Sequence, residues 1–420
     1  MSPTGEESIF SNFSSESISV EERKLLDRQM RLPGWNQQVL KESRVLIVGV
    51  GGLGCEVAKN LAMAGVGTLH LVDLDLIEYS NLNRQILFIG AHNEGRPKAI
   101  VAAEKLKEIN PYGNYFGYHC ALEELSPELF EEVDLVVAGL DSVQARANLN
   151  RKCVHANVPM IDAGTSTYYA HVYTIFPGKN ACLECDPQTE REQERLAACT
   201  LVGIPRKRAH CVLKGQLFFE SKHNRPPDIF SREEMQIVLD YANDLAKTHF
   251  PQDPLFGYDE TVSLVDQHEP SVITLNAVVA AIQSQEAIKI LHHQGGKGIG
   301  TMLTQYMVYN SLTGKFYTFD KPQNPKCLLC GPERMPLIEV TISSSQETLN
   351  QTLSRLCQDQ GWEIDAEFPP IFTRIDSRYL EELELDKTVN QLKIRNKETL
   401  LLVGLDDGEF YVKIILKKSE

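Results

Sequence analysis

A glycine-rich turn and the acidic residue that follows it are the first candidates for chemistry in this chain. An apolar run at residues 44–48, suited to a buried parallel strand, leads into a G-x-G-x-x-G sequence and then a helical pattern. Such a turn lets the backbone approach a phosphate at a helix N-terminus. A second strand, 68–72, ends at Asp73, about twenty residues past the last glycine, where dinucleotide-binding folds place a ribose-binding acid. The glycines of the turn are Gly49, Gly51, Gly52 and Gly54.

Basic residues beyond Asp73 separate two kinds of nucleotide enzyme. The glycine turn and Asp73 alone would suit a dinucleotide-dependent dehydrogenase equally well. A dehydrogenase needs no further cations here, whereas an enzyme that expels pyrophosphate must neutralise a triphosphate and its developing charge. The chain continues with Asp75, then Asn81, Arg84 and Gln85 in an Asn-Leu-Asn-Arg-Gln block, and Lys98 in Gly-Arg-Pro-Lys. The whole set favours an enzyme that cleaves a triphosphate.

A carboxylate after a third expected strand is the candidate ligand for a metal ion. The apolar run 133–138 is followed closely by Asp141. The carboxyl end of a parallel strand lies in the ligand crevice, where a carboxylate can hold Mg²⁺. For Asp141 alone, the N-cap of a following helix is an equally good interpretation.

Two C-x-x-C pairs stand out among the ten cysteines. Cys182 and Cys185 form one pair, and Cys327 and Cys330 form the other. Two such pairs fit a tetrahedral four-cysteine zinc site. Their separation is longer than in a compact zinc ribbon, so spacing alone leaves open a redox role or an incidental one for either pair.

A further cysteine, Cys199, has neighbours that suit a nucleophile. It precedes a proline-broken segment, and the cluster Arg206, Lys207, Arg208 and His210 follows closely. Positive charge lowers the pKa of a thiol and favours the reactive thiolate. A solvated loop explains the basic cluster about as well as direct activation of the thiol does.

Composition limits the classes of function. A chain of 420 residues should form two or three domains. The formal net charge of -15 argues against nucleic acid and anionic membranes as partners. We find neither an apolar segment typical of a signal peptide nor a transmembrane run, and therefore expect a cytoplasmic protein.

The run from Leu26 to Asp141 resembles the adenylation fold shared by ubiquitin-type activating enzymes and the bacterial molybdopterin- and thiamine-pathway adenylyltransferases. The resemblance rests on Asp27-Arg28-Gln29, the glycine turn, the aspartate pair, the Asn-Leu-Asn-Arg-Gln block, Gly-Arg-Pro-Lys and the late aspartate. It implies that Asp73 and Asp75 serve the ribose of ATP and that Asp141 holds Mg²⁺. It also implies phosphate-facing roles for Asn81, Arg84, Gln85 and Lys98.

The resemblance assigns roles to the remaining candidates as well. Arg28 would reach into the site of a partner subunit; a surface arginine paired with Asp27 or Glu42 is the alternative. Many family members carry the two cysteine pairs, which close one structural zinc site, here Cys182, Cys185, Cys327 and Cys330. The stretch from Cys199 to Cys211 resembles the catalytic segment of thioester-forming subunits, which implies that Cys199 is the nucleophile and Cys211 the second candidate.

The predicted fold class is α/β, with three domains after a disordered tail at 1–20. A Rossmann-like adenylation domain would take 21–185 and 271–333, and a mostly helical catalytic-cysteine insert 186–270. Residues 334–420 would form a β-grasp ubiquitin-fold domain, because a strand (338–342), an amphipathic helix (347–358), an Asp-Gly turn and a strand (409–416) follow in order. By resemblance, this last domain recruits a conjugating enzyme.

The predicted function is activation of a ubiquitin-like modifier. MgATP would adenylate the C-terminus of the modifier, Cys199 would form a thioester, and the modifier would pass to a conjugating enzyme. One chain carries both Arg28 and the ATP site, so we expect a homodimer. A sulfur-carrier adenylyltransferase is the main alternative, which the C-terminal domain and the long cysteine insert oppose. An inert subunit of a heterodimer is another, which intact Arg84, Lys98, Asp141 and Cys199 oppose.

Overall fold

The computed structural model describes residues 18–90, 93–185, 205, 208–223, 225–265, 272–296, 298–332, 334–362, 364, 369–375, 380–405 and 408–417. The chain separates into two compact units, one made of 1–185 with 271–420 and the other of 186–270. Of the predicted disordered tail, residues 1–17 lie outside the described part. Its end is ordered: Ile18 is buried, and the Ser19 side chain caps α1 (Val20–Met30) by accepting a hydrogen bond from Glu22 N.

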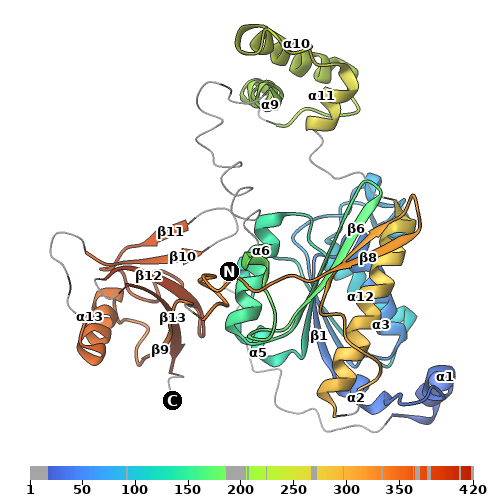
Figure 1. Cartoon of the computed structure of the whole chain (residues 1–420), viewed down its shortest axis with the longest axis vertical. Coiled ribbons are helices and arrows are strands. Elements are labelled where there is room, and N and C mark those ends of the chain that lie inside the picture. The colour runs from blue at the N-terminus through green and yellow to red at the C-terminus, as the bar shows by residue number, and fades with distance from the viewer. Residues whose placement is uncertain are drawn as a thin grey trace. The chain divides into compact units, whose positions relative to one another are not determined.

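The first unit contains an eight-stranded sheet in the order β3-β2-β1-β4-β5-β6-β7-β8 (Figure 1). The strands β1 to β5 pair with one another in parallel, whereas the pairs β5–β6, β6–β7 and β7–β8 are antiparallel. Apolar runs form the buried parallel strands, as their sequence predicts. The strands are β1 (Arg44–Val48), β2 (Thr68–Val72), β3 (Asn114–Tyr118), β4 (Leu135–Ala138), β5 (Met160–Ser166), β6 (Tyr169–Ile175), β7 (Tyr306–Asn310) and β8 (Lys315–Phe319).

Helices cover both faces of this sheet, and alternate side chains of each strand pack against different helices. Val45 and Ile47 of β1 pack in one core with α3, α4 and α12, whereas Leu46 and Val48 pack in a second core with α5 and α6 (Figure 1). This is the layered arrangement of an open α/β domain. The helices are α2 (Gln37–Glu42), α3 (Gly52–Met63), α4 (Lys98–Ile109), α5 (Pro127–Glu132), α6 (Val143–His155) and α12 (Ile273–Gln294). Short 3₁₀ turns lie at η1 (Tyr79–Asn81), η2 (Ile86–Phe88), η4 (Leu122–Glu124) and η5 (Leu183–Cys185).

A second sheet in the same unit has the order β11-β10-β12-β13-β9, with β13 parallel to β9 and the other pairs antiparallel. The helix α13 (Leu349–Gln360) shares a core with this sheet through Leu353 and Leu356. A capping box at Thr348 begins the helix, and Gly361, in the left-handed conformation, ends it. The strands are β9 (Leu337–Ile342), β10 (Ile371–Ile375), β11 (Leu380–Leu383), β12 (Thr399–Leu405) and β13 (Gly408–Leu416).

The second unit is helical where it is described. Its helices are α9 (Ala209–His223), α10 (Arg232–His249) and α11 (Tyr258–Val265). Cys211, Phe219, Met235 and Val238 belong to their common apolar core. Ser231 caps α10 by accepting a hydrogen bond from Glu234 N. Among the described residues, no helix has the length and apolar character needed to cross a membrane.

Candidate nucleotide site and metal centre

The candidate site lies at one edge of the large sheet, where three parallel strands end. Because β1 pairs in parallel with both β2 and β4, their carboxyl ends meet at the same edge. The chain leaves β1 for α3 on one face of the sheet and leaves β4 for α6 on the other. A crevice at such a change of direction is where open α/β sheets bind ligands. Gly49, Asp73 and Gly139 follow the three strands directly and so lie at this edge.

The glycine turn is packed tightly on its inner side and open on its outer side. Gly49 has φ +87°, and a Cβ there would lie 2.6 Å from Gly139 O. A Cβ on Gly54 would lie 1.9 Å from Gly49 O, whereas one on Gly51 would meet nothing within 4 Å. Gly51 is the N-cap residue of α3, so free space adjoins the backbone N–H groups that begin this helix. The turn therefore has the form of a phosphate cradle.

Asp73 orders the turn with both of its carboxylate oxygens. Its Oδ2 accepts from Val50 N at 2.6 Å, and its Oδ1 accepts from Asp75 N at 2.8 Å. Burial raises the pKa of Asp73 above its usual value, although the Lys98 ammonium and these two N–H groups act in the opposite direction. The carboxylate thus fixes the chain between β1 and β2 in addition to any contact with a ligand.

The two basic candidates, Lys98 and Arg84, have different kinds of partner. Lys98 donates to Asp75 Oδ2 at 2.8 Å; its own side chain is 9% exposed and that of Asp75 is 56% exposed, so the pair reaches from the interior to solvent. Arg84 is held by Ser80 O at 2.6 Å and by Asn83 Oδ1 at 3.2 Å.

Two amides of the same block are buried but differ in their partners. Asn81 Oδ1 accepts from Glu78 N at 3.0 Å and so caps the short helix η1. Gln85 is also buried, and its Oε1 has no hydrogen-bond partner among the described residues. An orphaned buried oxygen of this kind is expected where a further group binds.

Asp141 is exposed and does not cap the helix that follows it. Ser142 is the N-cap residue of α6, and its side chain accepts from Ala145 N at 3.4 Å. The alternative interpretation of Asp141 as an N-cap is therefore wrong, because the neighbouring serine fills that position. No ion pair joins Asp141 to any residue that the structure describes. A free carboxylate at this edge fits the oxygen ligands that Mg²⁺ prefers.

Four features of these residues fit a nucleotide with its metal ion. Gly51 leaves open space at a helix N-terminus, Gln85 presents an orphaned oxygen, Lys98 supplies a cation, and Asp141 supplies an unpaired carboxylate.

Arg28 lies on the exposed side of α1 and forms no ion pair with the described residues. The acids considered as its partners are engaged elsewhere: Asp27 pairs with Arg31 at 2.7 Å, and Glu42 accepts from Gln38 at 2.8 Å.

The four paired cysteines converge as the sequence predicts. All are buried, and their sulfur atoms lie within 4.8 Å of one another. Cys182 Sγ lies 3.8 Å from Cys327 Sγ, and Cys185 Sγ lies 3.3 Å from Cys330 Sγ. Disulfides would need about 2 Å, whereas tetrahedral zinc with Zn–S bonds of about 2.3 Å separates sulfurs by about 3.8 Å. Gln323 Nε2 also donates towards Cys330 Sγ at 3.6 Å, as residues around a metal-bound thiolate do. The cluster is therefore compatible with zinc.

The proposed nucleophile, Cys199, lies outside the described residues, as do Arg206 and Lys207. Its alternative, Cys211, is fully buried in the core of the helical unit. Burial raises the pKa of the Cys211 thiol, although Arg208 acts against this. Arg208 itself is paired with Glu260 at 2.5 Å. A buried thiol with a raised pKa is a poor nucleophile.

The sequence did not single out a buried ionic network beside the crevice. Arg146, in the first turn of α6, donates through Nε to Asp162 Oδ1 of β5 at 2.8 Å and lies 2.7 Å from His171 Nε2 of β6. Burial alone would raise the pKa of Asp162, but Arg146 and His171 hold it well below its usual range. The strand pattern gave no signal for this network, because its members lie on three separate elements.

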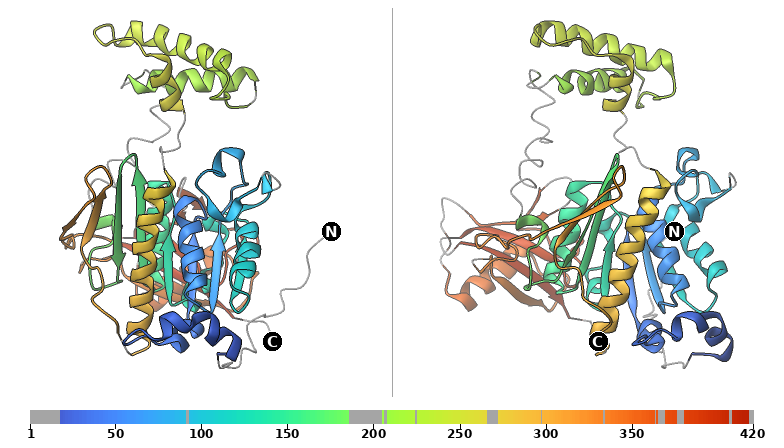
Figure 2. Two further views of the ribbon diagram at one scale, coloured as in Figure 1. Left: turned by 90° about the vertical axis from the view of Figure 1, so that its right-hand side faces the viewer. Right: turned by 45° about the vertical axis from the view of Figure 1, so that its right-hand side comes forward.

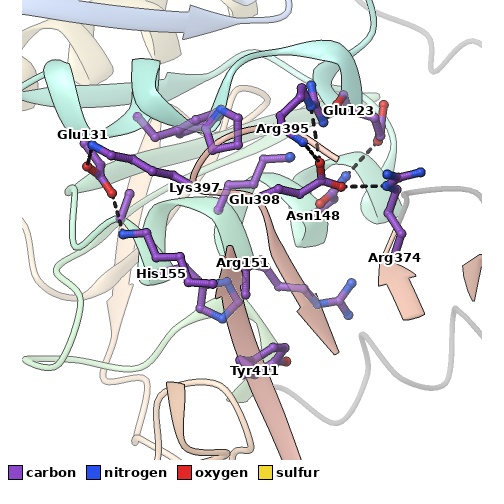
Figure 3. Close-up of a pocket in the computed structure, with 16 residues that line it drawn as sticks. Glu123, Glu131, Asn148, Arg151, His155, Arg374, Arg395, Lys397, Glu398 and Tyr411 are labelled. Carbon is purple, nitrogen blue, oxygen red and sulfur yellow. Dashed lines mark hydrogen bonds and ion pairs between the residues drawn. The ribbon is translucent and has the colours of Figure 1, made fainter. Parts of the chain in front are cut away.

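A cavity of about 80 Å³ lies away from the crevice, between α5, α6 and the second sheet (Figure 3). Its charges are shared within the protein. Glu131 pairs with both Lys397 and Lys413, and Glu398 pairs with Arg374 at 2.6 Å and with Arg395 at 3.6 Å. The Glu131 pairs join α5 to the C-terminal region, and the Glu398 pairs lie within that region. The cavity is therefore part of a packed interface, and we assign it no chemistry.

Known proteins match the chain over most of its length. The model of the ThiF family matches residues 26–329. The NEDD8-activating enzyme E1 catalytic subunit of Arabidopsis thaliana is 29% identical over 333 residues, which is 75% of this chain and 71% of the relative. The Drosophila melanogaster protein of the same name is 28% identical over 388 residues, 87% and 83% of the two chains. The SUMO-activating enzyme subunit 2 of Dictyostelium discoideum is 38% identical over 182 residues, 43% and 27%.

Among solved structures, E. coli MccB with succinimide shares 22% identity at a TM-score of 0.46, covering 70% of this chain and 68% of its own. The family model alone spans well over half of the chain and includes the glycine turn, the acidic and basic candidates and three of the four paired cysteines. The resemblance to ubiquitin-like-protein activating enzymes is confirmed, and the chain belongs to the ThiF family.

Proposed function

We propose that this protein activates a ubiquitin-like modifier in two steps. ATP and the C-terminal carboxylate of the modifier would first give an acyl-adenylate and pyrophosphate. The thiolate of Cys199 would then attack the acyl carbon, form a thioester and release AMP. The modifier would finally pass to the cysteine of a conjugating enzyme. The relatives named as NEDD8- and SUMO-activating enzymes support a modifier of this class.

The proposal for the first step rests on the residues that lie together at the carboxyl edge of the large sheet. The open face of Gly51 would admit a phosphate beside the N-terminus of α3. Lys98 would stabilise negative charge on the phosphates, with Asp75 as its partner in the free protein. Asp141 would hold Mg²⁺, which neutralises phosphate charge when it is bound. Asp73 would keep the turn in this geometry through its two backbone hydrogen bonds.

We propose that the protein acts as a homodimer in which Arg28 serves the partner subunit. The absence of an ion pair between Arg28 and the described residues supports a role outside its own surroundings. A guanidinium that reaches a neighbouring site could offset charge as pyrophosphate leaves.

Two further domains would serve the later steps. The unit 186–270 would carry Cys199, and 334–420 would be a β-grasp domain that recruits the conjugating enzyme. The mixed five-stranded sheet with α13 on it supports a β-grasp domain. The four-cysteine cluster would hold structural zinc next to the point where the chain enters this domain.

The test combines two assays on one set of variants. Purified protein with MgATP and candidate modifiers should catalyse modifier-dependent ATP–pyrophosphate exchange and form an adduct that thiols remove on a gel. Cys199→Ala should abolish the adduct and retain the exchange. Cys211→Ala is the matched control and should retain both. Exchange without any thiol-labile adduct in the wild type would instead support a sulfur-carrier adenylyltransferase.

A further inference from the structure

The helix α12, to which the chain returns after its second unit, reaches the glycine turn. This helix packs along α3 in one core, and both views in Figure 2 show the two helices side by side. The helix begins at Ile273, and Asn276 lies in its first turn, where the side chain is almost completely buried. An amide with this little exposure must be placed by specific partners.

The oxygen and the nitrogen of the Asn276 amide lie next to two different elements, the strand β5 and the start of α3. Its Oδ1 accepts from Thr165 Oγ1 of β5 at 3.4 Å. Its Nδ2 lies 2.3 Å from the position that a Cβ on Gly52 would take, and its Cγ lies 3.1 Å from the same position. The next atom there, Arg84 O, is 3.8 Å away, at an ordinary contact distance. Asn276 is therefore the group that fills the space beside Gly52.

Gly52 is the first residue of α3 and follows the open position at Gly51. The direction of the N–H groups that begin α3 depends on how closely this residue can approach its neighbours. Because Gly52 has φ outside the left-handed region, its lack of a side chain is explained by the space that Asn276 takes and not by its backbone conformation.

We infer that Asn276 is a positioning residue for the phosphate-binding turn, which links the start of α12 and the end of β5 to the start of α3. The inference rests on the proposed function insofar as the turn binds ATP. Asn276 acts through Gly52, because its amide fixes where the first N–H groups of α3 point. Residues on the two sides of the 186–270 unit thereby build a single site.

The experiment is a double-mutant cycle on the full-length protein. Gly52→Ala alone should lower the midpoint of thermal unfolding, because the new methyl group overlaps the Asn276 amide. In the Asn276→Ala background the same change should have a much smaller effect, because only Arg84 O remains near the methyl group, at 3.8 Å. The two effects should be non-additive, as expected for residues in contact. Additive effects would overturn the inference.

A second measurement separates positioning from packing. Asn276→Ala removes the amide that fills the space beside Gly52 and adds no charge, so ATP binding measured by calorimetry should weaken at least tenfold. The matched control is Asn60→Ala, which removes another α3–α12 hydrogen bond, from Asn60 Nδ2 to Ser284 Oγ at 3.2 Å, away from the turn. It should leave ATP affinity within about twofold. Equal ATP affinity in Asn276→Ala and wild type would refute the positioning role.

The two measurements distinguish failure of the inference from failure of the proposed function. If the wild type bound no ATP, the nucleotide function would be wrong, and the unfolding cycle would still decide whether Asn276 determines the conformation at Gly52.

Discussion

The glycine turn allows a paired test in which one substitution affects ligand binding and its neighbour affects folding. Gly51→Ala would place a methyl group in space that no described protein atom occupies within 4 Å. Gly54→Ala would place a methyl group 1.9 Å from Gly49 O, a backbone atom that cannot rotate away. The two glycines are three positions apart in one motif, so each variant is the control for the other.

The structure allows the size of each effect to be worked out. Gly51 is the N-cap residue of α3, with φ −81° and ψ −149°. Alanine adopts this φ freely, and the ψ lies about 30° beyond the β region, which is a small strain for alanine. Losing glycine from an N-cap costs about 0.5–1 kcal/mol, and the lower entropy of the unfolded chain offsets about 0.4–1 kcal/mol. The stability of Gly51→Ala should therefore stay within about 1 kcal/mol of wild type. Gly54→Ala forces backbone apart and should cost about 2 kcal/mol or more, or about 4–8 °C in Tm.

Calorimetric titration with MgATP and thermal unfolding are the two assays. Gly51→Ala should unfold near the wild-type temperature but bind ATP at least about tenfold more weakly, a loss of about 1.4 kcal/mol, because the methyl group blocks the approach of a phosphate. Wild-type affinity in a normally folded Gly51→Ala protein would refute the assignment of this turn as the phosphate cradle. Normal stability of Gly54→Ala would refute the packing argument.

Four further outcomes follow from the geometry. Asp141→Ala should abolish ATP–pyrophosphate exchange at physiological Mg²⁺ without lowering Tm, since the side chain is exposed; retained exchange would exclude it as the metal ligand. Metal analysis should find one zinc per chain, and Cys182→Ser should lose most of it and unfold at lower temperature; undiminished zinc in that variant would count against the site. Mixed dimers of Arg28→Ala and Asp141→Ala should recover part of the activity that each lacks alone, and no recovery despite confirmed subunit exchange would favour a role within one chain. A chain truncated near Pro332 should still form the thioester on Cys199 but transfer it poorly to the conjugating enzyme, whereas equal transfer would remove the recruiting role.

The sequence predicted the large sheet well where one signal was sufficient. Mostly apolar runs identified β1, β2 and β4, because parallel strands covered on both faces carry few polar residues. The start of α3 was less accurate. A helical pattern was expected from Cys55, yet the helix begins at Gly52. Glycine has low helix propensity, but here the tight contacts with Gly49 O and Asn276 hold it in the first turn.

The elements of the C-terminal region were predicted only in part. Its first and last strands and its helix follow the sequence pattern, and β12 pairs with β13 on either side of the expected hairpin turn. The strands β10 and β11 were not foreseen. The sequence pattern at 388–392 also indicates a helical turn, and a single turn forms there: Leu392 N donates to Thr388 O, Thr388 Oγ1 accepts from Gln391 N, and Lys393, with φ +53°, ends it.

In the candidate site, the sequence predicted residues that lie close together in the chain and missed one that lies far from the others. Motifs supplied the residues whose spacing is local, such as the glycine turn and the cysteine pairs. They did not supply Asn276, which lies more than 200 positions from the glycine it contacts. The segment 275–278 resembles the return of the family's chain to its adenylation core, but that resemblance gave the Asn276 side chain no role, and the surrounding apolar helix pattern alone predicts a core residue.

The two candidate nucleophiles illustrate how burial decides a question that sequence leaves open. Cys199 and Cys211 share the same basic neighbourhood, so charge alone could activate either thiol. The structure removes this symmetry for Cys211, because its side chain is packed in the core formed by α9, α10 and α11. Arg208, one of the two basic residues three positions from it, is paired with Glu260 and lies 3.9 Å from the Phe256 ring. Ionising Cys211 would mean burying a thiolate beside an arginine that is already paired with a carboxylate, so we expect the proposed thioester to form on Cys199 and not on Cys211.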